Sequence, residues 1–398
     1  MGYQSVRDLS VAGQRVFLRA DLNVPLKDGV ITDATRIEAT LPTLDLLLKA
    51  GAAVVLASHL GRPKGEGFEA AFSLAPVAAW LKARGYDATL APGVTGEAVE
   101  AAARALKPGQ VLLLENLRFD KGETKNKPEF AEALARLAQV YVDDAFGAAH
   151  RAHASVAGMV AHFPKGAVAA GLLMEKELQA LGKVVHAPEQ PLVVIFGGAK
   201  VSDKIELIQN FLGKARAILI GGAMSYTFLK AQGHPIGTSL CEEDKLDLAL
   251  TLLKEAEAKG TRLLLPVDHV AAPEFSADAA CVVTDGIAIP EGQMGLDIGP
   301  ETVALYADEI RAAKTLLWNG PMGVFEMAPF ASGTLSVADE LAKAADAGAF
   351  VLVGGGDSVA AVNQAGVADR MSHVSTGGGA SLEFLSGLTL PGVAALEA

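Results

Sequence analysis

The sequence predicts an α/β protein with two doubly wound parallel-sheet (Rossmann-like) domains joined by a hinge helix. Short apolar runs rich in β-branched residues recur along the whole chain, separated by Ala- and Leu-rich stretches with helical periodicity. This alternation is typical of parallel sheets covered by helices on both faces. The predicted strands are 15–18, 53–57, 111–114 and 140–142 in the first half, and 192–196, 217–220, 262–265, 315–318 and 350–353 in the second.

A single helix is expected between the two halves. Residues 171–185 place Leu172, Leu173, Leu178 and Leu181 at helical spacing, and Pro188 follows shortly after. Because one sheet containing all these strands would be unusually large, we divide the chain into a first domain, 1–170, and a second, 186–384. The helix between two such lobes is a candidate hinge.

Composition limits the classes of partner. The chain has 398 residues, of which 51% are hydrophobic, and a formal net charge of -12, which argues against nucleic acid or an anionic membrane as a partner. The N-terminus lacks a basic-then-apolar signal, and no apolar run approaches a membrane span. A soluble, cytoplasmic protein is expected. Cys241 and Cys281 have no metal or redox spacing and are expected to be buried as small hydrophobic residues.

Basic residues follow the strands of the first half. Ligands in open α/β sheets bind beyond the carboxyl ends of the strands, so these positions are candidates for binding. Arginine pairs bidentately with phosphate and carboxylate oxygens, and its recurrence at four strand ends indicates a pocket for a small polyanion. The residues at these ends and at the first helix are Arg19, Asp21, Asn23, Arg36, Ser58, His59, Arg62, Glu115, Asn116, Arg118, Asp143, Asp144, His150, Arg151 and His153.

The histidines of this set have alternative interpretations. His59 and the His150-x-x-His153 pair are candidate metal ligands, but no cysteine or paired carboxylates accompany them. Donors to phosphate or carboxylate, or histidines bonded to backbone, agree better with the pattern. For each arginine taken alone, a surface ion pair is the simpler interpretation.

Glycines follow the strands of the second half. The stretch 192–205 predicts a buried strand, a Gly197-Gly198 turn and a helix starting near Ser202 and Asp203, with Lys200 and Lys204 on one face of its first turns. Glycines let backbone approach a phosphate closely, although a flexible turn is the alternative. Further glycine sites are Gly221-Gly222, Asn319-Gly320, Gly354-Gly355-Gly356-Asp357-Ser358 and Gly377-Gly378-Gly379. Asp357 is a candidate ligand of Mg²⁺, which needs one or two carboxylates when nucleotide phosphates are bound.

A lobe for a small anion and a lobe for a nucleotide indicate a phosphotransferase. The P-loop, the protein-kinase catalytic loop and the dinucleotide fingerprint are absent from the sequence. Two other classes stay open: a non-catalytic two-lobed protein that closes on an anionic solute, and a nicotinamide-dependent dehydrogenase.

Several motifs together resemble the phosphoglycerate kinase family, nearly end to end. In the first half they are Arg19-Ala-Asp21-Leu-Asn23-Val-Pro25, Ser58-His59-Leu-Gly-Arg62-Pro63, Leu114-Glu-Asn-Leu-Arg118-Phe119 and Asp144-Ala-Phe-Gly-Ala-Ala-His150-Arg151-Ala-His153. In the second they are Gly197-Gly-Ala-Lys200-Val-Ser-Asp-Lys204, Trp318-Asn-Gly-Pro-Met-Gly-Val-Phe-Glu326, Gly354-Gly-Gly-Asp357-Ser358 and Ser375-Thr-Gly-Gly-Gly-Ala-Ser381.

The resemblance implies reversible, Mg²⁺-dependent phosphoryl transfer between ATP and the carboxylate of 3-phosphoglycerate, giving ADP and 1,3-bisphosphoglycerate in glycolysis. It implies that the acid is bound by Asp21, Asn23, Arg36, His59, Arg62, Arg118, His150 and Arg151. It assigns ATP or ADP to Gly197, Ala199, Lys200, Lys204, Gly221, Gly222, Ala223, Asn319, Glu326, Gly356, Asp357 and Ser358, with Glu326 at the ribose and Asp357 at the metal. Lys200, Arg36, Gly355 and Gly378, with Gly356 and Gly379, would face the phosphoryl group in flight.

The resemblance also implies a monomer, and a C-terminal segment, 385–398, that returns to the first domain. Small departures from the family pattern are visible: Asp143 and Ala148 stand where many members have Asn and Thr, Ala223 replaces a glycine found in some, and Ser358 replaces a common Thr. We expect these to leave the reaction intact.

Overall fold

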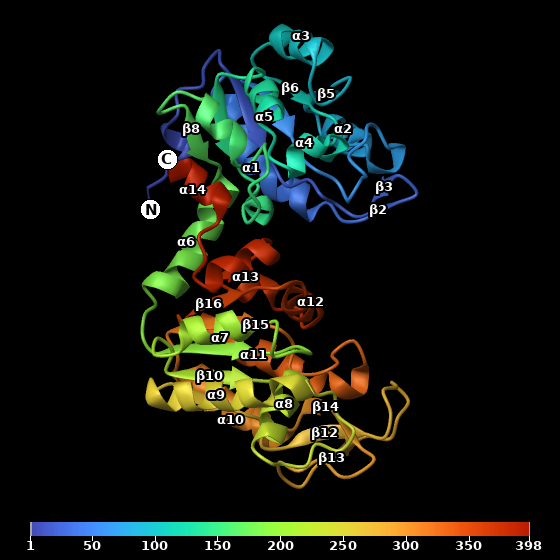
Figure 1. The fold of residues 1–398 in the computed structure, drawn as a ribbon, viewed down its shortest axis with the longest axis vertical. Coiled ribbons are helices and arrows are strands. Elements are labelled where there is room, and N and C mark those ends of the chain that lie inside the picture. Colours follow the sequence, from blue (N-terminus) through green and yellow to red (C-terminus); the bar gives the residue numbers. More distant parts are fainter. Residues whose placement is uncertain (1, 398) are drawn as a thin grey trace. The chain divides into compact units, whose positions relative to one another are not determined.

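The computed structural model describes residues 2–397 (Figure 1). Contacts divide the chain into two compact units: unit 1 is Met1–Gln179 with Thr389–Ala398, and unit 2 is Ala180–Leu388. The chain passes from one to the other within helix α6 (Leu172–His186), close to the helix expected at 171–185. The domain limits expected from the sequence stay a prediction.

Unit 1 is built on a parallel sheet with strand order β5-β6-β4-β1-β7-β8. Its strands are β1 (Arg15–Arg19), β4 (Ala53–Ala57), β5 (Asp87–Leu90), β6 (Gln110–Leu113), β7 (Val140–Asp143) and β8 (Val168–Ala170), with a separate hairpin of β2 (Leu26–Lys27) and β3 (Val30–Ile31). The helices are α1 (Thr35–Lys49), α2 (Ala75–Ala83), α3 (Glu97–Ala105), α4 (Lys121–Thr124), α5 (Pro128–Ala135), the first part of α6, and α14 (Pro391–Glu397).

The central strands of unit 1 are buried on both faces. Every residue of β4 is buried, and Val54 and Leu56 pack with Leu44 and Leu47 of α1 in one apolar cluster. A strand covered on both faces needs continuous apolar residues, and this is the run seen in the sequence. Strand β1 lies between β4 and β7. Since the direction of winding changes there, the crevice expected to bind ligands lies at the ends of these strands.

Unit 2 contains a parallel sheet of order β11-β10-β9-β15-β16-β17 and a smaller antiparallel sheet, β13-β12-β14. Its strands are β9 (Leu192–Phe196), β10 (Ala217–Ile220), β11 (Arg262–Leu264), β12 (His269–Ala272), β13 (Val282–Val283), β14 (Met294–Ile298), β15 (Thr315–Asn319), β16 (Phe350–Val353) and β17 (His373–Val374). Its helices are the rest of α6, α7 (Ile205–Phe211), α8 (Met224–Ala231), α9 (Leu246–Ala258), α10 (Pro300–Ala312), α11 (Ser332–Asp346), α12 (Gly356–Gln364) and α13 (Gly379–Leu385).

The parallel sheet of unit 2 has the strand order of the Rossmann fold. Numbered along the chain, its parallel strands run 3-2-1-4-5-6, with β9 as strand 1 and β15 as strand 4. Its core joins Val193 and Ile195 of β9 and Trp318 of β15 to Tyr306 of α10 and Leu341 of α11. The switch in winding lies between β9 and β15, where the sequence places Gly197 and Asn319.

The fold class expected from the sequence is confirmed, and the apolar runs fall on strands with shifts of a residue at some ends. Sequence periodicity did not indicate β5, β8, β17, the β2–β3 hairpin or the antiparallel sheet of unit 2. These strands are short or partly exposed; β13, for example, has both residues exposed. Without a continuous apolar run, periodicity gives no signal for them.

Two local expectations were wrong. Helix α7 begins at Ile205, not near Ser202, because the backbone N–H and hydroxyl of Ser202 both bond to Glu242 rather than capping a helix. Lys200 therefore precedes the helix. The cysteines are not buried either: Cys241 is half-buried and Cys281 is exposed, the latter next to the exposed strand β13.

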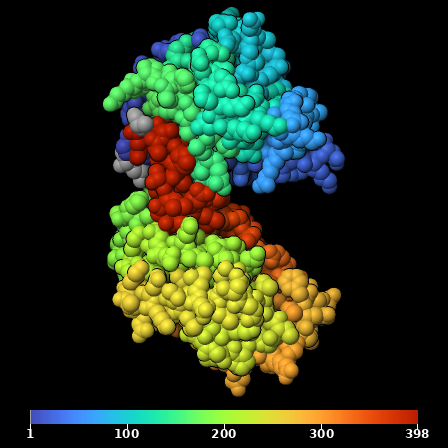
Figure 2. Space-filling view, viewed as in Figure 1, coloured from blue at the N-terminus to red at the C-terminus, as the bar shows by residue number. Residues whose placement is uncertain are grey.

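The C-terminal helix α14 belongs to unit 1, where it contacts the loop after β7. The backbone N–H of Gly392 donates to Ala149 at 2.8 Å, and a Cβ on Gly392 would lie 2.8 Å from Val156. Figure 2 shows this segment in red against the green surface of unit 1. None of the helices within residues 2–397 combines the length and the hydropathy needed to span a bilayer.

Candidate active site

The basic residues predicted from the sequence gather in unit 1. We define the basic pocket as Arg19, Asp21, Asn23, Arg36, His59, Arg62, Arg118, His150, Arg151 and His153. Their charges act on one another: Arg19, Arg118 and Arg36 lower the pKa of His59, and Arg118, Arg19, His150 and Arg151 lower that of His153, in both cases after the larger effect of burial. Four strand ends and helix α1 thus supply one cluster of positive charge.

Arg19 lies buried at the bottom of the basic pocket. Its side chain is fully buried, and its Nε donates to the Ser155 hydroxyl at 2.8 Å. The Ser155 hydroxyl in turn donates to Glu123 at 2.6 Å, and the same carboxylate accepts the Ser155 backbone N–H at 2.9 Å. Arg19 also donates to the carbonyl of Ala20. A buried carboxylate therefore balances the buried guanidinium through the hydroxyl between them.

Arg19 fixes the state of His59. Its Nη2 lies 3.3 Å from His59 Nδ1, and because a guanidinium can only donate, Nδ1 is the acceptor and Nε2 carries the proton. Burial, together with the smaller effect of the nearby arginines and against the opposing effect of Asp21, lowers the pKa of His59 to about 3. His59 is thus neutral at pH 7, with an N–H available to donate to an anion.

Asp21 and Asn23 organise the neighbouring backbone. Asp21 accepts from Arg36 Nη1 at 2.7 Å. Burial alone would raise its pKa, but the charges of His59 when protonated, Arg36 and Arg19 outweigh this and lower the pKa. Asn23 Oδ1 accepts the N–H of Gly61 at 2.8 Å, and the carbonyl of Gly61 accepts from Arg118 Nη1 at 2.9 Å. Gly61 has a positive φ of 60°, which suits glycine in this tight turn.

Several side chains of the basic pocket are accessible to solvent. Arg62 and Arg151 are exposed, while Arg36 and His150 are half-buried. Within the described part of the chain, Arg118 Nε and His153 Nδ1 are buried without a hydrogen-bond partner. His153 Nδ1 lies 3.9 Å from Glu123 Oε1. Buried polar atoms are normally satisfied, so the position of Arg118 Nε in a basic cluster suits water or an anion as its partner.

The buried carboxyl of Asp143 explains one departure from the family pattern. Asp143 ends β7 and accepts the N–H of Ala145 at 2.9 Å. Burial raises its pKa to about 7, although this hydrogen bond and Arg19 act in the opposite direction. A carboxyl that holds a proton near neutral pH is uncharged, as the expected Asn is, although Oδ2 of Asp143 has no hydrogen-bond partner among the described residues. Ala148 is buried in a small apolar cluster with Ala145 and Val156.

The glycine turns of unit 2 interlock at the switch between β9 and β15. Gly197 donates to the carbonyl of Asn319 at 3.0 Å, Gly198 to Pro321 at 3.1 Å, and Gly222 to Met322 at 2.8 Å. A Cβ on Gly197 would lie 2.0 Å from the carbonyl oxygen of Pro321, and one on Gly222 would lie 2.5 Å from the N atom of Gly198. These glycines are required by the packing of turn on turn, a reason that was not evident from the sequence.

Other glycines of this edge face open space. A Cβ on Gly356 or Gly378 would meet no atom within 4 Å, and both residues are exposed. Gly355 is intermediate: its φ is 92°, and a Cβ there would lie 2.8 Å from Asn319 Nδ2. Gly356 and Gly378 lie at the starts of α12 and α13, so their backbone is accessible to a ligand.

Asn319 connects three of these turns. Its Oδ1 accepts from Lys204 Nζ, and its Nδ2 donates to the carbonyl of Gly354 at 2.7 Å. Burial lowers the pKa of Lys204, while Asp203 and Asp357 oppose the shift. The hydroxyl of Ser358, fully buried, accepts the N–H of Gly320 at 2.6 Å, so it holds the turn after β15 from behind. Its contact with a ligand stays a prediction.

The remaining predicted residues project from this edge. Ala199, Lys200, Glu326 and Asp357 are all exposed, and Ala223 is half-buried at the start of α8. The described residues contain no cluster of three or more His, Cys, Asp or Glu side chains that could hold a metal ion by themselves. Asp357, in the first turn of α12 and within electrostatic range of Lys204, fits a metal that takes most of its other ligands from phosphate and water.

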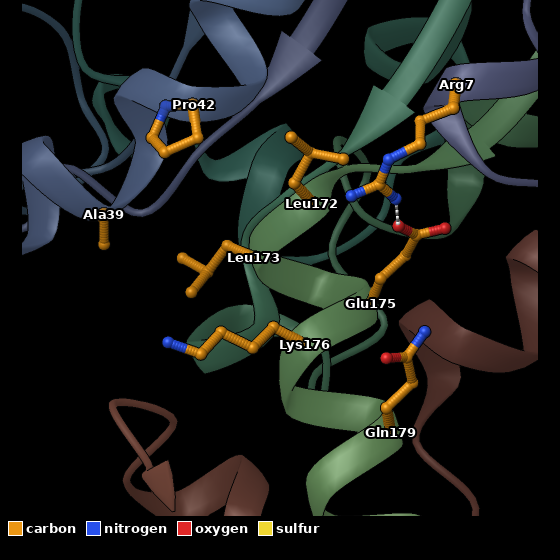
Figure 3. Close-up of a pocket in the computed structure, with 8 residues that line it drawn as sticks. All are labelled: Arg7, Ala39, Pro42, Leu172, Leu173, Glu175, Lys176 and Gln179. Atoms are coloured by element: carbon orange, nitrogen blue, oxygen red, sulfur yellow. Dashed lines mark hydrogen bonds and ion pairs between the residues drawn. The ribbon is translucent and has the colours of Figure 1, made fainter. Parts of the chain in front are cut away.

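A separate pocket of unit 1, about 440 Å³ in volume, lies away from these residues (Figure 3). Its lining residues are Ala39 and Pro42 of α1, residues of the N-terminal half of α6, and Arg7, which forms an ion pair with Glu175 of α6. None of the predicted site residues is among its lining residues.

Residues that sequence reasoning missed are mainly buried. The sequence places Arg19 in the basic edge but not among the residues assigned to the acid, and it gives no signal for Ser155 or Glu123. Ser155 lies two residues after His153, and an inward-facing hydroxyl beside a functional loop could have been considered. Glu123, in the short helix α4, is 32 residues away from Ser155 in sequence, so its contact with Ser155 could not have been predicted.

One unit thus presents a basic pocket, and the other a glycine-lined strand edge with lysines and one exposed aspartate. Together these define an enzyme of the phosphotransferase class, with an anionic acceptor and a nucleotide donor.

Comparison with known proteins shows which family of phosphotransferases the chain resembles. The family model described as "Phosphoglycerate kinase" matches residues 6–388. Phosphoglycerate kinase of Clostridium novyi is 54% identical over 99% of this chain and 98% of its own length, and that of Chloroflexus aurantiacus is 55% identical over 100% and 99%. The solved structure of phosphoglycerate kinase from Coxiella burnetii has a TM-score of 0.91 at 43% identity and covers 99% of this chain and 98% of its own.

The chain belongs to the phosphoglycerate kinase family. It is a kinase of glycolysis that transfers a phosphoryl group between ATP and 3-phosphoglycerate.

Proposed function

We propose that the basic pocket of unit 1 binds 3-phosphoglycerate and that the glycine-lined edge of unit 2 binds ATP or ADP. The observation that carries the proposal is the cluster of positive charge around Arg19 and the neutral His59, in which the buried Nε of Arg118 lacks a hydrogen-bond partner. A small acid with a phosphate and a carboxylate offers several acceptor oxygens to such donors. Arg36, Arg62, His150 and Arg151 complete the set.

The chemistry requires no general base. The acceptor is a carboxylate, which is ionised at neutral pH, so positioning and charge stabilisation must provide the rate acceleration. A neutral His59 agrees with this, because it serves as a donor. Lys200, Arg36 and the glycine turns at Gly355 and Gly378 would stabilise the charge of the transferring phosphoryl group. The transfer would be in-line, with closure about α6 excluding water from the reaction.

Asp357 would hold Mg²⁺, which neutralises phosphate charge when bound with the nucleotide. Glu326 would meet the ribose hydroxyls, and Lys204 with Asn319 would hold the turns around the phosphates. We also propose that the protein is a cytoplasmic monomer that binds neither nucleic acid nor membrane, in keeping with its net charge of -12.

The activity is tested by trapping the acyl phosphate. The protein is incubated with Mg²⁺, ATP, 3-phosphoglycerate and hydroxylamine, and hydroxamate is measured. We expect hydroxamate only when ATP and the acid are both present.

The Lys200→Ala variant should lower turnover at least tenfold, about 1.4 kcal/mol in activation free energy, if the Lys200 charge acts in the transition state.

The matched control is Lys254→Ala, which removes an exposed lysine of the same unit from helix α9. It should retain the wild-type rate. ATP binding without hydroxamate formation would contradict the assignment of the carboxylate as acceptor.

A further inference from the structure

Helix α11 begins without a capping side chain of its own. Its N-cap residue is Ala331, which has no acceptor for the free N–H groups of the first turn. Asp297, from strand β14, replaces the missing cap: its Oδ2 accepts the N–H of Gly333 at 2.7 Å, and its Oδ1 accepts the N–H of Ile298 at 2.9 Å. Gly333 is the second residue of the helix, where a capping side chain normally bonds.

The same carboxylate packs against the loop that follows β15. A Cβ on Gly323 would lie 2.3 Å from Asp297 Oδ1, and one on Gly333 would lie 2.4 Å from it. The side chain is therefore enclosed by the loop on one side and by the helix on the other. Asp297 itself is only 1% exposed.

Two more contacts fasten this loop at the same place. The N–H of Val324 donates to the carbonyl of Leu296 at 2.8 Å, which ties the loop to the residue before Asp297. The hydroxyl of Thr334, next to Gly333, accepts the N–H groups of Met322 and Gly323 at 3.0 and 3.2 Å. The first turn of α11 and strand β14 thus hold residues 322–324 together.

This loop connects two residues of the nucleotide site. Asn319 ends β15 immediately before the loop, and Glu326 lies two residues after Val324. We propose that Asp297 is a positioning residue that holds the 320–331 loop in the conformation that receives the nucleotide. The inference rests on the proposed function, since it needs the nucleotide at this edge, but it concerns a residue outside the binding set.

Both partners of Asp297 are N–H donors, so the position requires two acceptors. An asparagine has the same shape but turns an NH₂ group toward one of these donors, leaving buried polar groups unsatisfied. The test is Asp297→Asn, with KM for ATP, KM for 3-phosphoglycerate and kcat measured separately. We expect KM for ATP to rise about tenfold, while KM for the acid and kcat stay within about twofold of wild type.

The matched control is Asp268→Asn. Asp268 also caps a helix from outside, accepting the N–H groups of Glu301 and Thr302 in the first turn of α10 at 2.9 and 2.7 Å. Asp268→Asn should lower the free energy of unfolding by about as much as Asp297→Asn does, and it should leave both KM values unchanged. If Asp268→Asn changed KM for ATP as much as Asp297→Asn does, or if Asp297→Asn changed both KM values equally, a specific positioning role would be excluded.

A second variant keeps the test decisive if Asp297→Asn does not fold. Thr334→Val removes the acceptor for Met322 and Gly323 on the other side of the loop and should also raise KM for ATP selectively, whereas Thr334→Ser should restore it. Unchanged KM for ATP in Thr334→Val would overturn the inference. An inactive wild-type enzyme would instead contradict the proposed function, so the two failures are distinguishable.

Discussion

The same residue type at a strand end can have different roles, and the direction of the side chain decides between them. Arg19 and Arg62 both follow strands of unit 1, and the sequence predicted both as part of a basic edge. Arg19 is fully buried and fixes His59, whereas Arg62 is exposed. Sequence could predict the edge because parallel strands end together. It could not predict the direction, which depends on partners such as Ser155 and Glu123 from distant segments.

Asp143 allows a prediction about stability and pH. Its pKa of about 7 in the folded protein lies above the value of an unfolded aspartate, so its ionisation opposes folding. The penalty is absent below about pH 4, grows as the pH rises toward 7 and is constant above it. Asp143→Asn should therefore stabilise the protein at pH 7.5, by up to roughly 4 kcal/mol, and have little effect at pH 4.

Urea denaturation of the wild type and Asp143→Asn at both pH values measures this. Glu129→Gln, at an exposed position on α5, is the control for loss of a carboxylate. A stabilisation that is the same at both pH values would show that ionisation of Asp143 is not its source.

At the scale of elements, buried aspartates from other segments cap the first turns of several helices. Asp144 accepts the N–H groups of Leu173 and Met174 in α6 at 2.8 and 3.2 Å, and Asp268 and Asp297 do the same for α10 and α11. The helices α10 and α11 start after Gly299 and Ala331, which carry no capping group. Helix existence was thus predictable from periodicity, but exact starts depend on contacts between residues far apart in sequence, as the misplaced start of α7 also illustrates.

The glycines that follow the strands of unit 2 divide into two kinds, with opposite expected effects of substitution. Gly197→Ala places a methyl group 2.0 Å from the carbonyl oxygen of Pro321, so it should destabilise the protein by about 3 kcal/mol or more. Gly356→Ala enters open space and should change stability by less than about 0.5 kcal/mol.

Gly356→Ala is therefore the informative variant for function. If the backbone at Gly356 approaches a phosphate, this variant should unfold like the wild type yet bind the nucleotide more weakly. Thermal unfolding and titration of Mg²⁺-ADP measure the two properties. Unchanged nucleotide affinity would remove Gly356 from the binding site, and strong destabilisation would contradict the open environment.

At the scale of the whole molecule, we propose that the different chemistry at the carboxyl ends of the two sheets accounts for the two substrates. Unit 2 has the strand order of a nucleotide-binding fold, and its glycines meet at the switch between β9 and β15. Unit 1 places its arginines and histidines at the ends of β1, β4, β6 and β7. The sequence predicted this division because long apolar strands and the residues after them are local signals. The short edge strands and the antiparallel sheet lack such signals.

We propose that each unit carries one substrate. The most direct measurement is calorimetric titration of 3-phosphoglycerate and of Mg²⁺-ADP, separately, into the wild type, Arg62→Ala and Glu326→Ala. Both side chains are exposed, so neither change should disturb packing. Arg104→Ala, an exposed arginine on α3, is the control for loss of charge.

We expect Arg62→Ala to weaken 3-phosphoglycerate about tenfold, the effect of losing a charge-assisted hydrogen bond, and to leave ADP unchanged. Glu326→Ala should weaken ADP and leave the acid unchanged. If each variant weakened both ligands equally, or if Arg62→Ala weakened only ADP, the assignment of one substrate to each unit would be wrong.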